Sequence, residues 1–547
     1  VSGTYFINDD TILCQDTYIV NGTAIIINAS NIELDCNGTT INYSGGGEFG
    51  YGINVTNHNN TIIRNCLLNP NVQVADTIGV YISEDLNCLI DNNTVTESDN
   101  NADGIYISSS NCTISNNIIS TSVWGTGTAL TLADADNSTV INNAISENSI
   151  ASYGIYIYNT DSTRFINNSM FAEYDTILIA SSTNITLRNN TLDSDDDQSI
   201  TLNGDQISHF NHTIAPSNTI DGKPINYTFN AHNTEYAGIN NDYGEFILAW
   251  SNNVTIQNSN FSDEGLYVIR SNNFTLYNTN INTTGGDALD LYYSDYANIS
   301  NIVMDTTCQN CQGLNAEYCD FANIAHNSLS ANHSVLLLGY SNDATIFNNS
   351  INKPLGTWGL HISAGERNEI LMNTINASGD AVRLIINANN NVLSNNTIYC
   401  ADDCIIISAL SGNNKLINNN LYESGSGSTI EDTSGGSYRN ILIYNNSLGQ
   451  IYWNQTDISS DVNLSIGENI FINTNLVGLI GNPDVGQLNT SAIIEIRNLE
   501  YLQTPYLLKN GIRCDNTSAC NISWNGSTLV ANVSSFSNYT TSGNSTP

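Results

Sequence analysis

Three aspartates have the residue type and the spacing best suited to catalysis. Asp380 stands in "GDAVRLI", and Asp402 and Asp403 stand in "ADDCIIIS", about one sequence repeat further along. Paired carboxyl groups can act as general acid and general base in the cleavage of glycosidic bonds. A structural interpretation is simpler, because Asp also opens other strands of this chain, as at Asp103 and Asp287, where it tolerates the turn conformation.

A second acidic group, "DSDDDQ", contains Asp193, Asp195, Asp196 and Asp197. Carboxylate oxygens are the ligands that Ca²⁺ prefers, so these residues are candidate calcium ligands. A solvated acidic loop is the alternative interpretation, and we favour it. Apart from this possible Ca²⁺, we expect no cofactor, because the seven histidines show no metal-ligand spacing.

The twelve cysteines are an even number. Cys308, Cys311 and Cys319 could suggest zinc, but they lack a nearby fourth ligand, so disulfides are favoured. Cys88 and Cys112 occupy equivalent places in successive repeats and should pair. Cys400 with Cys404 and Cys514 with Cys520 are expected local pairs, and Cys308 and Cys311 are disulfide candidates without an assigned pairing. Cys36 and Cys66 also align in successive repeats, although Cys14 competes for either, so the connectivity stays open.

The charge of the chain limits its partners. Lys and Arg number 13 against 52 Asp and Glu, which gives a formal net charge of −39. Nucleic-acid binding needs Lys and Arg at the phosphates, so it is excluded as a function. No apolar run approaches the roughly 18 residues of a membrane span.

Several features suggest an exported protein. The chain begins at Val1 without an initiator Met, and its cysteine usage suits an oxidising compartment. Residues 542–547 form a Ser/Thr/Pro-containing tail that resembles the start of a stalk, and a longer precursor with a membrane anchor is one expectation. We therefore expect an extracellular protein at the cell surface.

Acceptor sites for N-glycosylation, Asn-X-Ser/Thr, number roughly thirty, moderately more than composition alone would generate. We expect N-glycans at some of them. The candidate sites are Asn21, Asn54, Asn137, Asn184, Asn211, Asn253, Asn273, Asn298, Asn376, Asn463, Asn525 and Asn538.

The positions of all these residues are set by a repeat. Its template is an apolar residue, two variable residues, Asn, one variable residue and an apolar residue, and it recurs about every 21 to 27 residues, as in solenoids. The template asparagines are Asn93, Asn117, Asn143, Asn168, Asn190, Asn327, Asn349, Asn373, Asn396, Asn419 and Asn446.

Each template follows a Gly or Asp turn and a short alternating strand, such as "DGIYIS" or "DAVRLI". Two or three short strands per repeat predict one coil of a right-handed parallel β-helix. Stacked coils repeat about every 4.8 Å, so an inward Asn could bond to its equivalents above and below. About sixteen coils would give a rod of about 75 Å.

The predicted class is all-β, with the β-helix over residues 1–455. Residues 193–243 hold no copy of the template and should form an insertion or an irregular coil. After residue 455 the pattern stops, and residues 456–541 are expected to form a small β-sandwich that covers the open edge of the last coil.

The chain resembles right-handed parallel β-helix repeat proteins of the pectate-lyase-like superfold, of the kind found in secreted archaeal cell-surface proteins. The phrases "SNIELDCNGTTINYSGGGEFGYGINV" and "SNTIDGKPINYTF" carry this resemblance. The phrases around Asp380 and Asp402 also resemble the "NTDG" and "GDDC" motifs of polygalacturonases. That family's Gly-His-Gly is replaced here by "SGSGSTI", and its Arg-Ile-Lys is missing.

Three functions remain open. The favoured one is a glycosylated structural or adhesive cell-surface protein that assembles with itself into a filament, sheath or surface layer; it is not expected to be an enzyme. The alternatives are a polysaccharide-degrading hydrolase or lyase that uses Asp380, Asp402 and Asp403, and a non-catalytic carbohydrate-binding adhesin that uses surface Tyr and Asn. The superfold alone does not choose among them.

Overall fold

The computed structural model describes residues 3–45, 49–71, 75–98, 100–122, 125, 127–149, 152–195, 198–308, 310–355, 358–435, 438–455, 457–479, 488–515 and 517–543. In these ranges the chain is built from short strands, with one 3₁₀ turn, η1 (Ile207–Phe210). No helix in the described ranges is long and apolar enough to cross a membrane. The predicted all-β parallel β-helix is confirmed.

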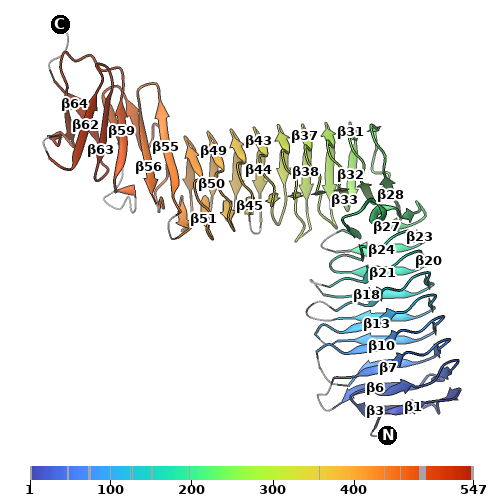
Figure 1. Ribbon diagram of the computed structural model, residues 1–547. Helices are drawn as coiled ribbons and strands as arrows, with labels where there is room; N and C mark the ends of the chain where they lie inside the picture. The colour runs from blue at the N-terminus through green and yellow to red at the C-terminus, as the bar shows by residue number, and fades with distance from the viewer. Residues whose placement is uncertain are drawn as a thin grey trace.

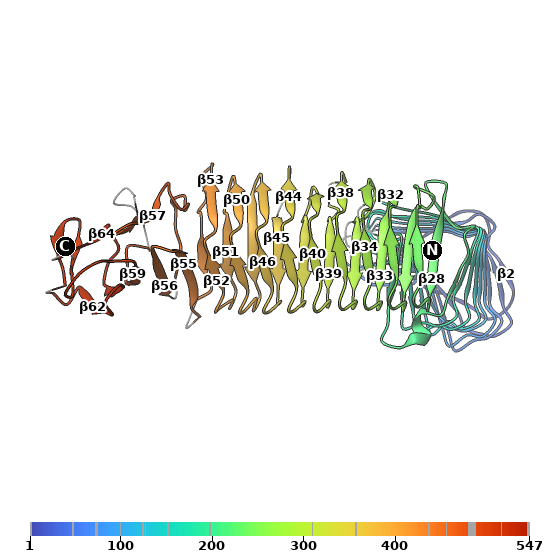
Figure 2. The ribbon, with the colours of Figure 1, turned by 90° about the horizontal axis from the view of Figure 1, so that it is seen from above.

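The coils form two stacks that meet at a corner (Figure 1). Seen from above, the first stack is viewed nearly along its axis while the second runs across the view (Figure 2). The first stack covers residues 5–220, the second stack covers residues 223–433, and an antiparallel end region follows to residue 542. The repeat predicted one continuous rod of coils, whereas the molecule bends between the two stacks.

The first stack has three parallel sheets of nine strands each, which we name 1A, 1B and 1C. Sheet 1A contains β1 (Tyr5–Ile7), β4 (Ile25–Ile27), β7 (Tyr51–Thr56), β10 (Ile78–Ser83), β13 (Asp103–Ser108), β16 (Leu130–Ala133), β19 (Ile155–Tyr158), β22 (Ile177–Ala180) and β25 (Ile200–Asn203). Sheet 1B contains β2 (Thr11–Ile12), β5 (Glu33–Asp35), β8 (Ile62–Arg64), β11 (Leu89–Asp91), β14 (Thr113–Ser115), β17 (Thr139–Ile141), β20 (Arg164–Ile166), β23 (Thr186–Arg188) and β26 (Thr213–Ile214). Sheet 1C contains β3 (Thr17–Asn21), β6 (Thr40–Gly45), β9 (Leu67–Pro70), β12 (Thr94–Glu97), β15 (Ile118–Thr121), β18 (Ala144–Glu147), β21 (Ser169–Ala172), β24 (Thr191–Ser194) and β27 (Thr219–Ile220).

The second stack also has three parallel sheets, 2A, 2B and 2C. Sheet 2A contains β28 (Lys223–Phe229), β30 (Glu245–Ala249), β33 (Gly265–Ile269), β36 (Leu289–Tyr292), β39 (Leu314–Glu317), β42 (Leu336–Gly339), β45 (Trp358–Ser363), β48 (Asp380–Ile385), β51 (Ile405–Ser408) and β54 (Glu431–Thr433). Sheet 2B contains β29 (Glu235–Ala237), β31 (Thr255–Gln257), β34 (Thr275–Tyr277), β37 (Asn298–Ser300), β40 (Asn323–Ala325), β43 (Thr345–Phe347), β46 (Glu369–Leu371), β49 (Val392–Ser394) and β52 (Lys415–Ile417). Sheet 2C contains β32 (Asn260–Asp263), β35 (Asn280–Thr283), β38 (Val303–Thr306), β41 (Ser328–Ser330), β44 (Ser350–Lys353), β47 (Thr374–Ala377), β50 (Thr397–Cys400) and β53 (Asn420–Glu423).

Aliphatic side chains in register form the core of each stack. In sheet 1A the partners Ile53, Val80, Ile105, Leu130 and Ile155 follow one another in successive strands, and all are fully buried. β-Branched and other aliphatic residues pack well on the inner face of a pleated sheet. One coil cannot bury this face alone, so each repeat is stabilised by the next.

The template asparagines other than Asn446 form the predicted hydrogen-bonded ladder. The Oδ1 atom of Asn117 accepts from the backbone N–H of Asn93 at 2.9 Å and from its Nδ2 at 3.0 Å, and Asn143 does the same for Asn117 at 2.8 and 3.0 Å. A second ladder runs from Asn349 through Asn373 to later repeats. Because every polar atom of the amide finds a partner, these side chains can be buried at little cost.

Segment 193–243, predicted to be an insertion or an irregular coil, forms the corner. β25, β26 and β27 complete a further coil of the first stack, and the hairpin between β27 and β28 then starts the second. Outward residues of the second stack, Ile247, Tyr267 and Ile269, are buried in the core cluster of the first. The bend is therefore fixed by apolar packing.

The end region contains two antiparallel sheets. One extends sheet 2B through β55 (Asn440–Asn446), β56 (Gly449–Gln455), β59 (Ala492–Ile496), β63 (Leu529–Val533) and β62 (Cys520–Trp524), and the other contains β57 (Ile470–Asn473), β58 (Leu476–Leu479), β64 (Tyr539–Ser542), β60 (Tyr506–Lys509) and β61 (Ile512–Arg513). Trp453 of β56 and Tyr539 of β64 lie in one core.

The antiparallel region begins at β55, earlier than the predicted boundary at residue 456. Consequently Asn446 does not belong to a coil. It lies at the end of the β55–β56 hairpin, where its Nδ2 donates to the carbonyl of Ile472 at 2.7 Å. Tyr444 covers the last step of the ladder, since its hydroxyl donates to the carbonyl of Asn419 at 2.8 Å.

Candidate functional site

The structure brings Asp380, Asp402 and Asp403 together on the second stack. Asp380 opens β48, and the other two lie in the turn between β50 and β51, which the Cys400–Cys404 disulfide closes. One carboxylate oxygen of each aspartate lies within 4.8 Å of the others. Stacking of equivalent turns places them side by side, as their spacing of one repeat predicts.

Hydrogen bonds from the backbone orient two of these carboxylates. Oδ1 of Asp380 accepts from the N–H of Asp403 at 3.3 Å, and Oδ1 of Asp403 accepts from the N–H of Ser428 at 2.6 Å. Asp402 is exposed, whereas Asp380 and Asp403 are half-buried. The group is therefore accessible to a ligand from solvent.

Burial and neighbouring charges favour protonation of Asp380 and Glu431. Burial raises the pKa of Asp380, and the neighbouring Asp403 and Asp402 raise it further, while Arg383 opposes the shift. Burial also raises the pKa of Glu431, on which the three aspartates act in the same direction. Glu431 is thus a fourth member that sequence reasoning did not include.

Aromatic and basic groups lie beside the acids. The Arg383 guanidinium carbon is 4.5 Å from the ring centroid of Trp358, and the ring centroid of His361 is 4.6 Å from it. Burial lowers the pKa of His361 to about 4, and Arg383 contributes in the same direction, so the imidazole is neutral at pH 7. Trp358 pairs with Asp380 across β45 and β48.

Sequence reasoning missed these neighbours because it searched for basic residues in later coils, as the resemblance implied. Arg383 lies in the same strand as Asp380, and His361 is its register partner in the preceding coil. The outward phase of the alternating pattern in "DAVRLI" was the available signal.

The arrangement can act as a general acid or bind a hard cation. Its carboxylate oxygens lie closer together than the roughly 6.5–9.5 Å that an inverting hydrolase keeps for its attacking water. Carboxylates that share a site hold protons more readily and also attract cations.

The other predicted sites are less organised. Asp193, at the end of β24, and Asp195 are exposed; burial, with Asp221 and Asp195 nearby, raises the pKa of Asp193. Asp196 and Asp197 lie outside the described residues. In the ranges that the structure describes, Asp193 and Asp195 are not part of any group of three potential metal ligands.

All twelve cysteines lie in the described ranges. Disulfides join Cys88 to Cys112, Cys308 to Cys311, Cys400 to Cys404, Cys514 to Cys520 and, between successive coils, Cys36 to Cys66. Cys14 is an exposed thiol, and Cys319 is a buried one whose pKa burial raises. Of the three cysteines considered for zinc, Cys308 and Cys311 form a disulfide and Cys319 is buried in the core.

The candidate glycosylation sites all lie at accessible positions. Nine are exposed, namely Asn21, Asn137, Asn184, Asn211, Asn253, Asn273, Asn376, Asn525 and Asn538, and Asn54, Asn298 and Asn463 are half-buried. Their occupancy stays a prediction.

Comparison with known proteins agrees with the architecture. A family model described as "right handed beta helix region" matches residues 51–220, and one described as "periplasmic copper-binding protein (NosD)" matches residues 211–384. No curated protein matches significantly.

Among solved structures, the chain is similar to a mutant tailspike protein of E. coli bacteriophage HK620, with 11% identity, TM-score 0.25, and 99% of this chain and 86% of that chain covered. It is similar to the Azotobacter vinelandii mannuronan C-5 epimerase AlgE6 A-module, with 11% identity, TM-score 0.23, and 74% and 92% covered. It is also similar to the Dettilon tailspike protein, with 11% identity, TM-score 0.22, and 98% and 86% covered. Likeness at this level carries no information about activity.

The architecture and the first family model define the class: the chain is a right-handed parallel β-helix repeat protein. The match to the family model described as a periplasmic copper-binding protein does not show that this chain binds copper. Copper sites use imidazole, thiolate or thioether ligands. In the part of the chain that the structure describes, the one group of three close potential ligands is the carboxylate trio Asp380, Asp402 and Asp403, which does not fit copper.

Proposed function

We propose that the protein is an extracellular, glycosylated structural or adhesive component of a cell surface that assembles end to end with copies of itself. The observation that carries the proposal is that, of the five most exposed large apolar side chains in the described ranges, all but Leu355 lie in the first coil or in the end region. Phe6 (60% exposed) and Ile12 (73%) lie in the first described coil, and Leu502 (63%) and Ile512 (75%) lie in the end region. Isolated apolar residues on a surface are ordinary, but groups of them mark interaction sites.

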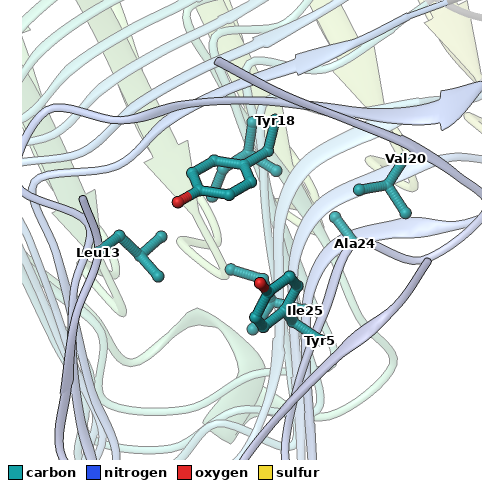
Figure 3. Close-up of a pocket in the computed structure, with 7 residues that line it drawn as sticks. Tyr5, Leu13, Tyr18, Val20, Ala24 and Ile25 are labelled. Carbon is teal, nitrogen blue, oxygen red and sulfur yellow. The ribbon is translucent and has the colours of Figure 1, made fainter. Parts of the chain in front are cut away.

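The first coil offers more than two apolar side chains. β1, β2 and β3 are edge strands of the three sheets of the first stack, and Tyr5 and Ile19 are exposed beside them. Figure 3 shows the rings of Tyr5 and Tyr18 facing a small pocket that Leu13 also lines. Unpaired strand edges next to apolar side chains favour addition of a further strand.

The end region also has edge strands beside exposed apolar side chains, like the first coil. β61 and β62 are edge strands of its two sheets, and Ile512 lies on β61. The two surfaces differ in sequence and lie at opposite ends of the molecule (Figure 1), so contact between them is heterologous and can continue from copy to copy. Disulfides between coils and accessible acceptor asparagines are consistent with an exported protein.

Replacement of Ile12 by Lys tests the proposal, because a charge at the first coil should oppose an apolar contact. We expect native protein to form filaments or oligomers in electron microscopy and light scattering, and Ile12→Lys to remain monomeric. Leu355→Lys is the matched control, since Leu355 is 64% exposed but lies between the ends.

Cys14 gives an independent measurement. It is an exposed thiol in the first coil, whereas Cys319 is buried, so a maleimide dye should react with Cys14 alone. We expect labelling to slow when the protein concentration is raised. Filaments that form equally well with Ile12→Lys, or Cys14 labelling independent of concentration, would exclude this interface.

A second function is favoured by one specific observation, the convergence of Asp380, Asp402 and Asp403. A polysaccharide hydrolase using this group should lose activity in Asp402→Asn and keep it in Asp305→Asn, on sheet 2C. Binding of a glycan without turnover would instead favour an adhesin. The calcium site at Asp193 and Asp195 stays a prediction, which titration of native protein with Ca²⁺ would test.

A further inference from the structure

A cleft between the two stacks has no role in the proposed assembly. It has a volume of about 240 Å³ and is lined by residues of both. Tyr153 and Tyr174 come from loops before β19 and β22 of the first stack, and Tyr292 and Glu317 end β36 and β39 of the second. Residues several coils from the corner on both stacks can share one cleft only on the inner side of the bend (Figure 1).

Two hydrogen bonds between the stacks hold the cleft in shape; Tyr267 lines the cleft, whereas Arg270 lies outside its lining, with its guanidinium carbon 4.2 Å from the ring centroid of Tyr293. The hydroxyl of Tyr267 donates to the carbonyl of Leu202 at 3.0 Å, and Nε of Arg270 donates to the carbonyl of Gly204 at 2.7 Å. Both bonds join the second stack to β25, the last strand of sheet 1A, or to the residue that follows it. The cleft is therefore preformed, so little ordering cost opposes binding.

The lining is acidic and, in the part of the chain that the structure describes, contains no Lys, Arg or His. Asp175 and Asp287 are each only 4% exposed, and Asp290 and Glu317 lie beside them on the second stack. Burial raises the pKa of Glu317. Several carboxylates with little access to water favour a ligand that brings positive charge.

Hydrogen bonds hold two of these carboxylates in place. Oδ1 of Asp287 accepts from the N–H of Gln312 at 2.5 Å, and Oδ1 of Asp290 accepts from Nδ2 of Asn315 at 3.1 Å. Both donors belong to the next coil, so the stacking of coils fixes the acidic wall of the cleft.

Aromatic rings form part of both walls. The ring centroids of Tyr153 and Tyr174 are 5.8 Å apart, and Tyr292 packs edge to face against Tyr293 at 4.6 Å. The negative face of an aromatic ring attracts cations, most strongly where water is excluded. The aromatic rings and the carboxylates therefore both favour a ligand with positive charge.

We propose that this cleft binds an organic ammonium group, a protonated amine or a quaternary ammonium. A bare metal ion is disfavoured because, among described residues, only Asp380, Asp402 and Asp403 form a trio with ligand atoms close enough for shared coordination. The volume is below the roughly 300–1,000 Å³ of drug-sized sites, so the ligand is small. The proposal does not depend on end-to-end assembly.

Calorimetric titration of the full chain with choline tests this proposal. The neutral compound of the same shape, 3,3-dimethyl-1-butanol, isolates the effect of charge, and ethanolamine distinguishes a primary amine from a quaternary one. We expect choline or ethanolamine to bind and the neutral compound not to bind. Tyr292→Leu and Asp290→Asn should each weaken binding at least about fivefold.

Tyr399→Leu and Asp305→Asn are the control variants, because both residues are on sheet 2C of the second stack, outside the cleft. They should leave the affinity unchanged. Tyr174→Leu, on the other wall, repeats the test if Tyr292→Leu folds poorly. Each of three results would overturn the proposal. The neutral compound could bind as well as choline, or all cleft variants could leave the affinity unchanged. The cleft could also bind Ca²⁺, with loss of that binding in Asp290→Asn, and bind no choline.

Discussion

At the scale of single residues, buried polar groups are tolerated where the neighbouring coil supplies their partners. Asn373 shows this well: its Nδ2 donates to the carbonyl of Ile346 at 2.8 Å and to Oδ1 of Asn396 at 3.1 Å, and its Oδ1 accepts from Asn349. The sequence predicted this ladder because a single residue type recurs at one position of the repeat. It could not predict the orphaned nitrogens of His361, which depend on a surrounding Trp and Arg.

Replacing Asn373 by Leu should destabilise the protein by about 2–4 kcal/mol, because it leaves buried backbone groups in two coils without partners. Thermal unfolding followed by circular dichroism measures the effect. Asn352→Ala, at an exposed position of sheet 2C, should change stability by less than about 0.5 kcal/mol. Equal effects of the two substitutions would show that the ladder contributes nothing specific.

His361 should make the protein less stable in acid. Its folded pKa of about 4 lies below the usual 6.5, so the unfolded chain binds its proton first as the pH falls. The free energy of unfolding is therefore unaffected by this histidine above pH 6.5, and it falls by up to about 3 kcal/mol as the pH is lowered from 6.5 to 4. Urea unfolding of wild type and His361→Phe at several pH values isolates it, and parallel pH profiles would contradict it.

At the scale of strands and coils, alternation predicted strands such as β13 ("DGIYIS") and β48 ("DAVRLI"), and it also predicted β33 ("GLYVI") as a strand with one buried face. It did not predict that β30 ("EFILA") and β33 are buried on both faces, which suits their mostly apolar runs. Those runs were a signal that a second layer covers the outer face. The identity of that layer, the end of the first stack, depends on contacts far apart in sequence and has no local pattern.

Links between coils should contribute more to stability than links within a turn. Cys88 and Cys112 are 24 residues apart in sequence, whereas Cys308 and Cys311 are 3 apart. On the chain-entropy model the double variant Cys88→Ala/Cys112→Ala should lose about 3 kcal/mol, about twice the loss from the short loop. Denaturant unfolding compares the two, and a larger loss from the short loop would contradict the model here.

At the scale of the whole molecule, the periodic sequence fixes the diameter and length of each stack but not the angle between them. The bend depends on a few apolar residues of the second stack, above all Ile247, Tyr267 and Ile269, which pack into the core of the first. The cleft is a consequence of the bend, so neither its aromatic nor its acidic residues could be grouped from their spacing. Asp380, Asp402 and Asp403 could be grouped from their spacing, because they lie in neighbouring coils.

Tyr267→Ala should loosen the corner while both stacks stay folded, since it removes a buried ring and its bond to Leu202. Small-angle X-ray scattering should show a broader distribution of molecular dimensions, and limited proteolysis should cut between the stacks. Tyr277→Ala, at an exposed position of sheet 2B, is the control. An unchanged scattering profile would show that the bend is held by other contacts.

A bent subunit gives an assembly properties that a straight one lacks. If copies join end to end, the axis of the filament differs from the axis of either stack, because each subunit changes direction at its corner. The angle at the corner then contributes to the helical pitch of the filament. Such a filament can lengthen under tension by small openings at each corner, without breaking a single ladder of hydrogen bonds. The fibre would be elastic although every segment of it is stiff.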